Sequence, residues 1–475
     1  SRAIVSLVKF EPSIDYLLNQ ESNPDFKLTL SEQISSICNS KLLIEFIGVS
    51  PLPDLDLENA LTKLRSLVLS SISKISVTSK LLKFQSALAL QCFTNEYIYS
   101  HTEEEEKLLN SLEAIAKKAV KNNDQPSPQI ILALASYKAL NEYDWCKFLV
   151  ATDHIKDVFN RQFEEPNEEE KIKKQLPILK EINDSISSKV REQYEESPYP
   201  RWINAGLFFK PMSVSNVVDQ MKIKLHDNKI RDLEKPEILI AGCGTGQHSI
   251  ETAARFKSSK VLAIDLSLSS LAYAKRKTQE LVSETIKYMQ ADILDLGTLT
   301  KQFDIIESSG VLHHMDNPTV GWRVLTDCLK PGGLMKIGLY SELARQHIVK
   351  MRQEISKSGI GSSDTTMKSF RTMVMKSDQN HHKQILASKD FYSLSTLKDL
   401  LFHVKEHRFT ISQLKQCLGD LGLKFCGFET QMVSHFKQTN KAKDALYDLD
   451  KWQAYEEANP RAFGAMYQFW CQKVD

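Results

Sequence analysis

Several features that assign a chain to a broad class are missing from this sequence. No apolar stretch approaches the roughly 18 to 20 residues of a membrane-spanning helix, and the opening SRAIVSLVKF has no signal-peptide pattern. We therefore expect no membrane insertion. The eight cysteines form no C-x-x-C pair and no disulfide framework, which favours free thiols and a cytoplasmic location.

An excess of charge of one sign is also missing. The chain has 61 Lys and Arg against 60 Asp and Glu, a formal net charge of +1. Such a balance provides no long-range field for a phosphate backbone, so we expect no nucleic-acid partner. The 475 residues predict two to four domains.

From Lys41 to about Asn160 the apolar residues recur at helical spacing. Thr102 followed by Glu105 is a capping box that predicts the start of a helix, and no repeat consensus is present. The charge run EEPNEEEKIKK at 164–174 predicts a boundary. We assign residues 1–165 to an N-terminal α-helical domain.

After this boundary, short β-rich runs alternate with helical ones, which predicts an α/β fold with a parallel sheet. Residues 185–340 form the predicted core, residues 341–410 a helical insertion at the acceptor cleft, and residues 411–475 the last two strands. We expect Pro331, Gly332 and Gly333 to turn into the fifth strand. The predicted strands are 237–241, 260–264, 286–290, 303–308, 334–340, 424–430 and 465–472.

Three successive strands end in residues suited to a nucleoside ligand. Glycines after the first strand allow close backbone approach, Asp265 can accept from ribose hydroxyls, and Asp292 can accept from an exocyclic amine. The spacing matches neither a dinucleotide fingerprint nor a P-loop. The candidate cofactor-binding residues are Gly242, Cys243, Gly244, Thr245, Gly246, Gln247, Asp265, Leu266, Asp292, Ile293, Ser308 and Ser309.

Together with FDIIESSGVLHHM and LKPGGLMKIG, these motifs resemble the class I S-adenosylmethionine-dependent methyltransferases. The resemblance implies a Rossmann-like core of seven strands, the last antiparallel, with S-adenosyl-L-methionine as cofactor. The SSGV sequence at the fourth strand lacks the Asn/Asp-Pro-Pro-Tyr/Phe motif of amide and adenine methyltransferases, so we do not expect a nucleic-acid base as acceptor.

Aromatic residues gather in QYEESPYPRW at 193–202 and DFYSLSTLKDLLFHVKEHRFT at 390–410. With ALALQCFTNEYIYSHTEEEEKLL and the C-terminal aromatic segment, they resemble the rickettsial lysine methyltransferases of an outer membrane protein. This resemblance implies N-methylation of several lysines on an unfolded or nascent outer membrane protein. Two alternatives stay open: a small-molecule methyltransferase, and a partner-binding helical module with a weakly active core. A homodimer is also left open.

The catalytic candidates are of two kinds. Aromatic rings could desolvate a lysine ammonium and contact it through cation–π interactions, and these rings are Tyr194, Tyr199, Trp202, Phe391 and Tyr392, of which Tyr199, Trp202 and Tyr392 are the main candidates. Glu307, His313 and His314 are titratable groups near the end of the fourth strand, and a supporting hydrogen bond or helix-cap contact is the other interpretation of each. We expect no metal site, because the rings of the adjacent pairs His313-His314 and His381-His382 should diverge.

Overall fold

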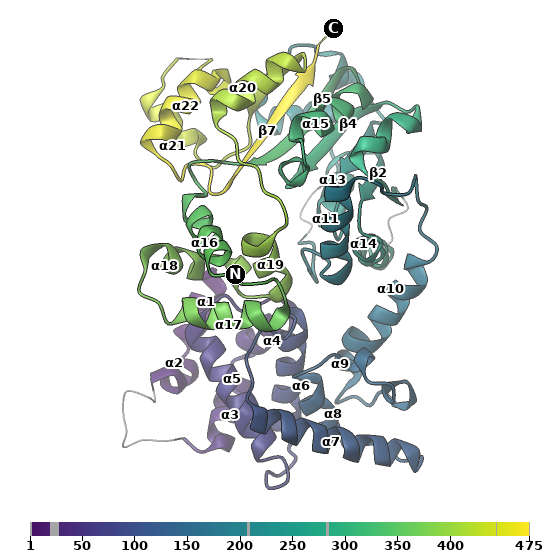
Figure 1. The fold of residues 1–475 in the computed structure, drawn as a ribbon, viewed down its shortest axis with the longest axis vertical. Coiled ribbons are helices and arrows are strands. Elements are labelled where there is room, and N and C mark those ends of the chain that lie inside the picture. The colour runs from purple at the N-terminus through teal and green to yellow at the C-terminus, as the bar shows by residue number, and fades with distance from the viewer. Residues whose placement is uncertain (1, 20–27, 207–209, 282–284, 443, 475) are drawn as a thin grey trace. The chain divides into compact units, whose positions relative to one another are not determined.

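The computed structural model describes residues 2–19, 28–206, 210–281, 285–442 and 444–474. It divides into two compact units (Figure 1). Unit 1 comprises residues 1–168, 201–204 and 354–401, and unit 2 comprises residues 169–200, 205–353 and 402–475. The segment between the fifth and sixth strands therefore contributes to both units.

Unit 1 is built from helices. Several begin at a capping side chain, and the predicted box at Thr102 and Glu105 is present. The helices of its N-terminal part are α1 (Arg2–Lys9), α2 (Pro12–Leu18), α3 (Leu30–Asn39), α4 (Lys41–Val49), α5 (Leu55–Ser70), α6 (Ser79–Thr94), α7 (Glu103–Lys121), α8 (Pro128–Ala135), α9 (Lys156–Phe159) and the first part of α10 (Glu165–Lys173).

The insertion adds further helices to unit 1. They are α17 (Asp364–Met375), α18 (Asn380–Leu386), most of α19 (Leu394–Phe402) and the last residues of α16 (Gln346–Lys357). Arg371 of α17 forms a two-pronged ion pair with Glu58 of α5, with both N–O distances 2.7 Å. Both side chains are 4% exposed, so the pair fixes the insertion to the N-terminal helices inside this unit.

Unit 2 contains one seven-stranded sheet in the order β3-β2-β1-β4-β5-β7-β6. All neighbours pair in parallel except β7, which is antiparallel to both β5 and β6. The strands are β1 (Glu237–Ala241), β2 (Lys260–Asp265), β3 (Ile286–Gln290), β4 (Phe303–Ser309), β5 (Leu329–Tyr340), β6 (Leu423–Phe428) and β7 (Met466–Lys473). The expected Rossmann-like core with an antiparallel last strand is confirmed.

One detail of the fifth strand differs from the prediction. Residues 331–333 do not precede the strand but lie within β5, which begins at Leu329. Leu329 pairs with Phe303 and Leu334 with Ile305, so the register shifts between these pairs. The Pro-Gly-Gly sequence is absorbed as a bulge, because Gly332 adopts a φ of 75° that other residues rarely adopt.

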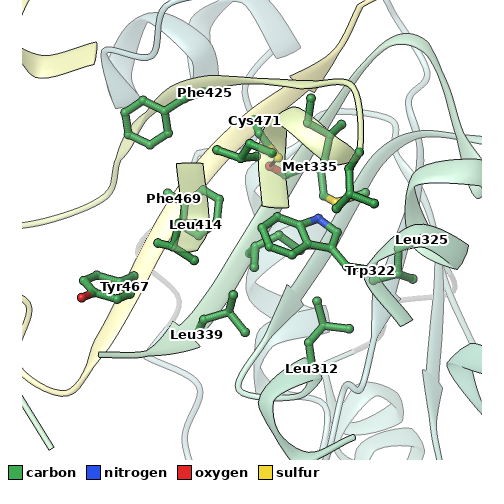
Figure 2. Close-up of a cluster of buried hydrophobic side chains, with 14 of the residues drawn as sticks. Leu312, Trp322, Leu325, Met335, Leu339, Leu414, Phe425, Tyr467, Phe469 and Cys471 are labelled. Atoms are coloured by element: carbon green, nitrogen blue, oxygen red, sulfur yellow. Dashed lines mark hydrogen bonds between the residues drawn. The ribbon is translucent and has the colours of Figure 1, made fainter. Parts of the chain in front are cut away.

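The helices of unit 2 are α11 (Ser185–Glu196), α12 (Val214–Met221), α13 (Gln247–Arg255), α14 (Leu268–Glu280), α15 (Pro318–Cys328), α20 (Ile411–Asp420), α21 (Val433–Thr439) and α22 (Leu449–Ala458). One apolar cluster packs Trp322 of α15 and Leu414 of α20 against Met335, Phe469 and other sheet residues (Figure 2). This core fixes β7 together with β4 and β5, and the ends of β4 and β5 carry Ser308, Ser309 and Tyr340 of the candidate site. Among the described residues, no helix has the length and apolar character to span a membrane.

Candidate active site

The glycine loop after β1 is the best defined part of the site. Gly244 adopts a φ of 52°, and a Cβ at this position would lie 2.7 Å from the carbonyl oxygen of Tyr199. Gly246 has a φ of 86°, and its Cβ would lie 2.5 Å from Cβ of Ala274. Only glycine fits either position, so the loop keeps bare backbone at the carboxyl end of the sheet.

Asp265 at the end of β2 ties the loop to the sheet. Its Oδ2 accepts from the backbone N–H of Gly244 at 2.8 Å, and its Oδ1 accepts from the N–H of Ser267 at 3.0 Å. Burial raises the pKa of Asp265 despite these hydrogen bonds. Each oxygen keeps further acceptor capacity, which is what two ribose hydroxyls require.

Asp292 lies after β3 and is 4% exposed. Its Oδ1 accepts from the N–H of Leu294 at 3.0 Å, and the Ser187 hydroxyl also donates to the carboxylate. Burial raises its pKa as well. Next to Asp265, the carbonyl oxygen of Leu266 accepts from the side chain of Gln290 at 2.8 Å, and Ile293 belongs to the buried core.

The remaining cofactor candidates follow the ends of β1 and β4. Cys243 is buried, and burial raises the pKa of its thiol well above the usual value. Gln247 opens α13 and donates to Glu251. The Ser308 hydroxyl is fully buried and has no hydrogen-bond partner within the described ranges, whereas Ser309 is partly exposed and lies 3.7 Å from Sδ of Met466.

Glu307 contacts α13, the helix that follows the glycine loop. Its carboxylate is fully buried and accepts from His248 and Thr252 of α13. Burial alone would raise its pKa, but the hydrogen bond and charge of His248, together with the nearby Lys336, lower it to about 2. The structure thus places Glu307 in a link between β4 and α13.

The aromatic segment before β1 lies directly on the glycine loop. The carbonyl oxygen of Tyr199 sits over Gly244, and the carbonyl oxygen of Pro200 accepts from the Thr245 hydroxyl. Upstream, Glu195 accepts from the N–H of Leu268 at 2.5 Å and so caps α14, the helix that follows Asp265. The segment is held on the loop by backbone and side-chain contacts within one unit.

Six rings run from this segment to the end of β5, and we call them the aromatic row. It consists of Tyr199, Tyr194, His403, His314, His313 and Tyr340. Successive ring centroids are 6.4, 5.8, 3.6, 4.3 and 3.7 Å apart. The two tyrosines next to the glycine loop are partly exposed, and the other four rings are buried. The row therefore leads from a solvent-accessible face into the interior.

The buried histidines of the row are held neutral. Burial lowers the pKa of His403 to about 4, and burial with nearby positive charge lowers the pKa values of His313 and His314 well below the usual range. The Lys405 carbonyl oxygen lies 2.7 Å from Nδ1 of His314 and 2.8 Å from Nδ1 of His403. Both ring nitrogens of His313 lack a hydrogen-bond partner in the part of the chain that the structure describes.

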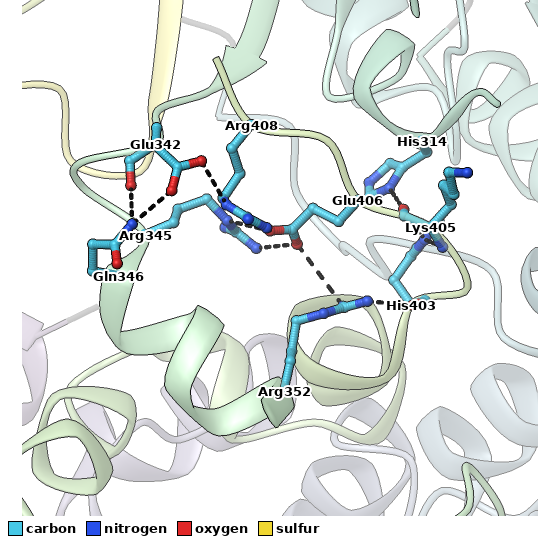
Figure 3. A network of polar contacts seen from close by, with 9 residues as sticks. All are labelled: His314, Glu342, Arg345, Gln346, Arg352, His403, Lys405, Glu406 and Arg408. Carbon is cyan, nitrogen blue, oxygen red and sulfur yellow. Dashed lines mark hydrogen bonds and ion pairs between the residues drawn. The ribbon is translucent and has the colours of Figure 1, made fainter. Parts of the chain in front are cut away.

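A charged network adjoins the row, and Figure 3 shows it together with His314 and His403. Arg345 forms a two-pronged ion pair with Glu406, with N–O distances of 3.1 and 2.7 Å, and its guanidinium lies 3.5 Å from the ring centroid of Tyr340. Both side chains of this pair are at most 2% exposed. Arg352 donates to the His403 carbonyl oxygen, and Arg408 pairs with Glu342 at 3.0 Å. These contacts fix the backbone that carries His403.

The sequence-predicted catalytic residues are divided between the two units. Tyr199, Glu307 and His313 belong to unit 2, and Trp202 and Tyr392 belong to unit 1. Trp202 is 8% exposed, and the Tyr392 hydroxyl donates to the Leu386 carbonyl oxygen at 3.0 Å. Sequence reasoning named Tyr194 among the aromatic candidates and His314 among the titratable groups, but it did not select Glu195, His403 or Tyr340. The aromatic segment at 390–410 contained the signal for His403.

A comparison with protein families agrees with this geometry. Residues 238–333, from β1 to the bulge in β5, match the model of the methyltransferase-domain family. The chain carries a class I S-adenosylmethionine-dependent methyltransferase domain. The domain's cofactor is S-adenosylmethionine, and the glycine loop, Asp265 and Asp292 fit it, since they offer bare backbone and two carboxylate acceptors at adjacent strand ends.

Individual relatives match this domain over part of their length. An uncharacterised protein of Synechococcus sp. is 29% identical over 47% of this chain and 56% of its own. A ubiquinone biosynthesis O-methyltransferase of Rickettsia canadensis is 28% identical over 35% of this chain and 68% of its own. A malonyl-[acyl-carrier protein] O-methyltransferase of Halalkalibacterium halodurans is 31% identical over 24% and 43%. The chain spans about half the length of the first curated relatives it matches.

Among solved structures, PKMT2 from Rickettsia typhi is similar at 16% identity and a TM-score of 0.43, covering 58% of this chain and 54% of that one.

Proposed function

We propose that this protein is an S-adenosylmethionine-dependent protein lysine N-methyltransferase acting on unfolded or nascent outer membrane protein. The observation that carries the proposal is the aromatic row, which begins at the glycine loop with the partly exposed Tyr199 and Tyr194. Its sequence support is the resemblance of the segments 193–202 and 390–410 to the rickettsial lysine methyltransferases.

In this proposal the chain's own residues prepare the acceptor amine. Lysine has a reference pKa of about 10.4, so the ammonium must lose a proton before it can attack. Tyrosine rings beside the glycine loop would remove water from the ammonium and lower its pKa. They would also hold a methylated ammonium through cation–π contact, which permits repeated transfer.

The histidines of the row have a different part. An imidazole with a pKa of about 4, such as His403, is a poor base for a lysine ammonium. Because these rings are neutral at pH 7, they also do not repel an approaching cation. We infer that desolvation and positioning, rather than a general base, supply the neutral amine. Bound S-adenosylmethionine supplies the electrophilic methyl group.

The roles of the individual residues follow from this assignment. Gly242, Gly244, Gly246, Asp265 and Asp292 would bind the cofactor, and Tyr199 and Tyr194 would contact the acceptor. Glu307 would support α13, since its carboxylate faces His248 and Thr252. We assign the protein to the cytoplasm, supported by its eight free cysteines. A homodimer remains open, and analytical ultracentrifugation would establish whether the protein is a monomer or a dimer.

A small-molecule O-methyltransferase is the second candidate. It is supported by the similarity to relatives described as O-methyltransferases of ubiquinone biosynthesis or of malonyl-[acyl-carrier protein]. A partner-binding helical module with a weakly active domain is the third. Transfer of labelled methyl to unfolded outer membrane protein fragments, phenolic small molecules and malonyl-[acyl-carrier protein], followed by mass spectrometry, distinguishes all three. Label confined to a small acceptor refutes the protein-lysine assignment, and cofactor binding without label supports the third candidate.

The aromatic row has its own test. Tyr199→Leu removes one ring and leaves the backbone carbonyl that lies over Gly244. We expect the KM for a lysine peptide to rise about tenfold while cofactor affinity stays within twofold, since a cation–π contact in a desolvated site contributes about 1 to 2 kcal/mol. Tyr447→Leu is the matched control, because Tyr447 is not part of the row and its hydroxyl donates to the carbonyl oxygen of Lys222. An unchanged KM for the lysine peptide in Tyr199→Leu would show that the Tyr199 ring does not contribute to acceptor binding.

A further inference from the structure

A second cluster of titratable side chains lies in unit 1, whereas the residues that would hold the cofactor belong to unit 2. Nε2 of His381 lies 2.5 Å from Oε1 of Glu354, and Nε2 of His382 lies 2.8 Å from Oε2 of the same carboxylate. The two imidazole centroids are 4.4 Å apart. Our expectation that the adjacent rings diverge and find no third ligand is therefore wrong for this pair.

The rings converge because of where α18 begins. His381 and His382 lie in its first turn, and Glu354 reaches them from the C-terminal part of α16. One ligand atom from each residue lies within 4.8 Å of the others. His382 is 1% exposed and its Nδ1 has no partner within the described residues, so this imidazole is held in place by packing.

We propose that Glu354, His381 and His382 bind a divalent transition-metal ion, with Zn²⁺ as the ion that best matches two imidazoles and one carboxylate. Three protein ligands with a remaining position for water are a recurrent zinc arrangement. The site has access to solvent, since the side chains of Glu354 and His381 are 35% and 16% exposed.

The geometry requires only a small adjustment. A tetrahedral ion with bonds of about 2.1 Å separates its ligand atoms by about 3.4 Å. The present N–O distances of 2.5 and 2.8 Å must then open by about 0.6 to 0.9 Å. Glu354 can make this movement, because it is the most exposed of the three.

The expected consequence is a cross-link between α16 and α18 within unit 1. A metal ion that binds only the folded protein stabilises it by mass action. Binding does not depend on the proposed methyl transfer, so the two proposals can fail independently.

The test is metal binding by the full-length protein after chelator treatment. Zn²⁺ is titrated at pH 7.5 against a chromogenic chelator, and Co²⁺ replaces it for visible spectroscopy. We expect one equivalent of Zn²⁺ with micromolar or tighter affinity, a rise in the thermal midpoint, and a cobalt spectrum without a thiolate charge-transfer band. A thiolate band, or no binding at micromolar Zn²⁺, overturns the proposal.

Variants locate the site. Glu354→Gln keeps the side-chain shape and His381→Ala changes a largely solvent-side ligand, so both should fold with an unchanged circular dichroism spectrum and lose at least tenfold in affinity. His101→Ala is the matched control, because His101 and Glu106 form an exposed pair in the same unit. Equal affinity in the wild-type protein and both site variants refutes the assignment.

Discussion

Gly244→Ala tests whether the glycine loop binds the cofactor as its geometry indicates. A left-handed conformation costs a residue with a Cβ about 1 to 2 kcal/mol. The new Cβ also meets the Tyr199 carbonyl oxygen at 2.7 Å, a contact that backbone must move to relieve. If the loop of the free variant relaxes to relieve this strain, cofactor binding must restore the strained conformation and becomes weaker by the same free energy. Each 1.4 kcal/mol of strain then lowers the affinity about tenfold.

The assay is calorimetric titration with S-adenosylhomocysteine, together with urea unfolding of the free protein. The strain in Gly244→Ala should appear partly as lost unfolding free energy and partly as lost binding free energy, and the two losses should together exceed about 1.4 kcal/mol. The affinity for S-adenosylhomocysteine should fall at least threefold. Gly422→Ala is the matched control. Gly422 has a φ of 68° but open space around its Cβ position, so it should lose stability and keep affinity. Wild-type affinity in Gly244→Ala would refute the placement of the cofactor at this loop.

Three further predictions concern charge. Asp265→Asn should weaken S-adenosylhomocysteine binding at least tenfold in the same titration, since hydrogen bonds to charged groups contribute about 1.5 to 3 kcal/mol. Asp295→Asn is the control and should leave the affinity unchanged, because Asp295 pairs with Lys180 at the surface. Because the folded-state pKa of His403 is about 4 and its usual value is 6.5, the unfolded chain takes up the proton first as pH falls, and this group alone should lower the unfolding free energy by about 1.4 kcal/mol between pH 7.5 and pH 5.5. His313 and His314 act in the same direction, so in urea unfolding His403→Gln should reduce the pH dependence by about 1.4 kcal/mol without abolishing it. Arg371→Ala should lower the unfolding free energy of unit 1 by about 3 to 5 kcal/mol by leaving Glu58 buried without a partner, and Glu58→Gln in the same chain should recover part of it; a loss below 1 kcal/mol would contradict this.

The sheet could be predicted from the sequence because its strands carry their signal locally. The runs at 237–241 and 286–290 coincide with β1 and β3, and they are short, apolar and bounded by turn residues. The candidate cofactor residues could be proposed for the same reason, since Asp265 ends β2 and Asp292 lies two positions after the end of β3. Parallel strands bring such ends to one edge of a sheet without any long-range information.

Glu307 shows where local reasoning stops. Its position near the end of β4 favoured a place at the reacting groups, yet side chains of a strand alternate between the two faces. Ile306 enters the apolar core with Trp322, so Glu307 points to the opposite face and meets His248 and Thr252 of α13. The pairing partners lie 59 and 55 residues away, and no local pattern identifies them.

The row and the metal cluster depend on contacts between distant segments. Tyr194 and His403 are neighbours although 209 positions separate them, and Glu354 meets His382 across 28 positions. The contact between Tyr194 and His403 also requires that the loop carrying His403 be held in place. The ion pair between Arg345 and Glu406 does this, and no local pattern in the sequence indicates that these two charges pair. In this domain the strands determine the cofactor side, whereas the segments around residues 194–200 and 402–409 build the row. Under the proposed function, acceptor specificity would change through these segments while the glycine loop and Asp265 stay the same.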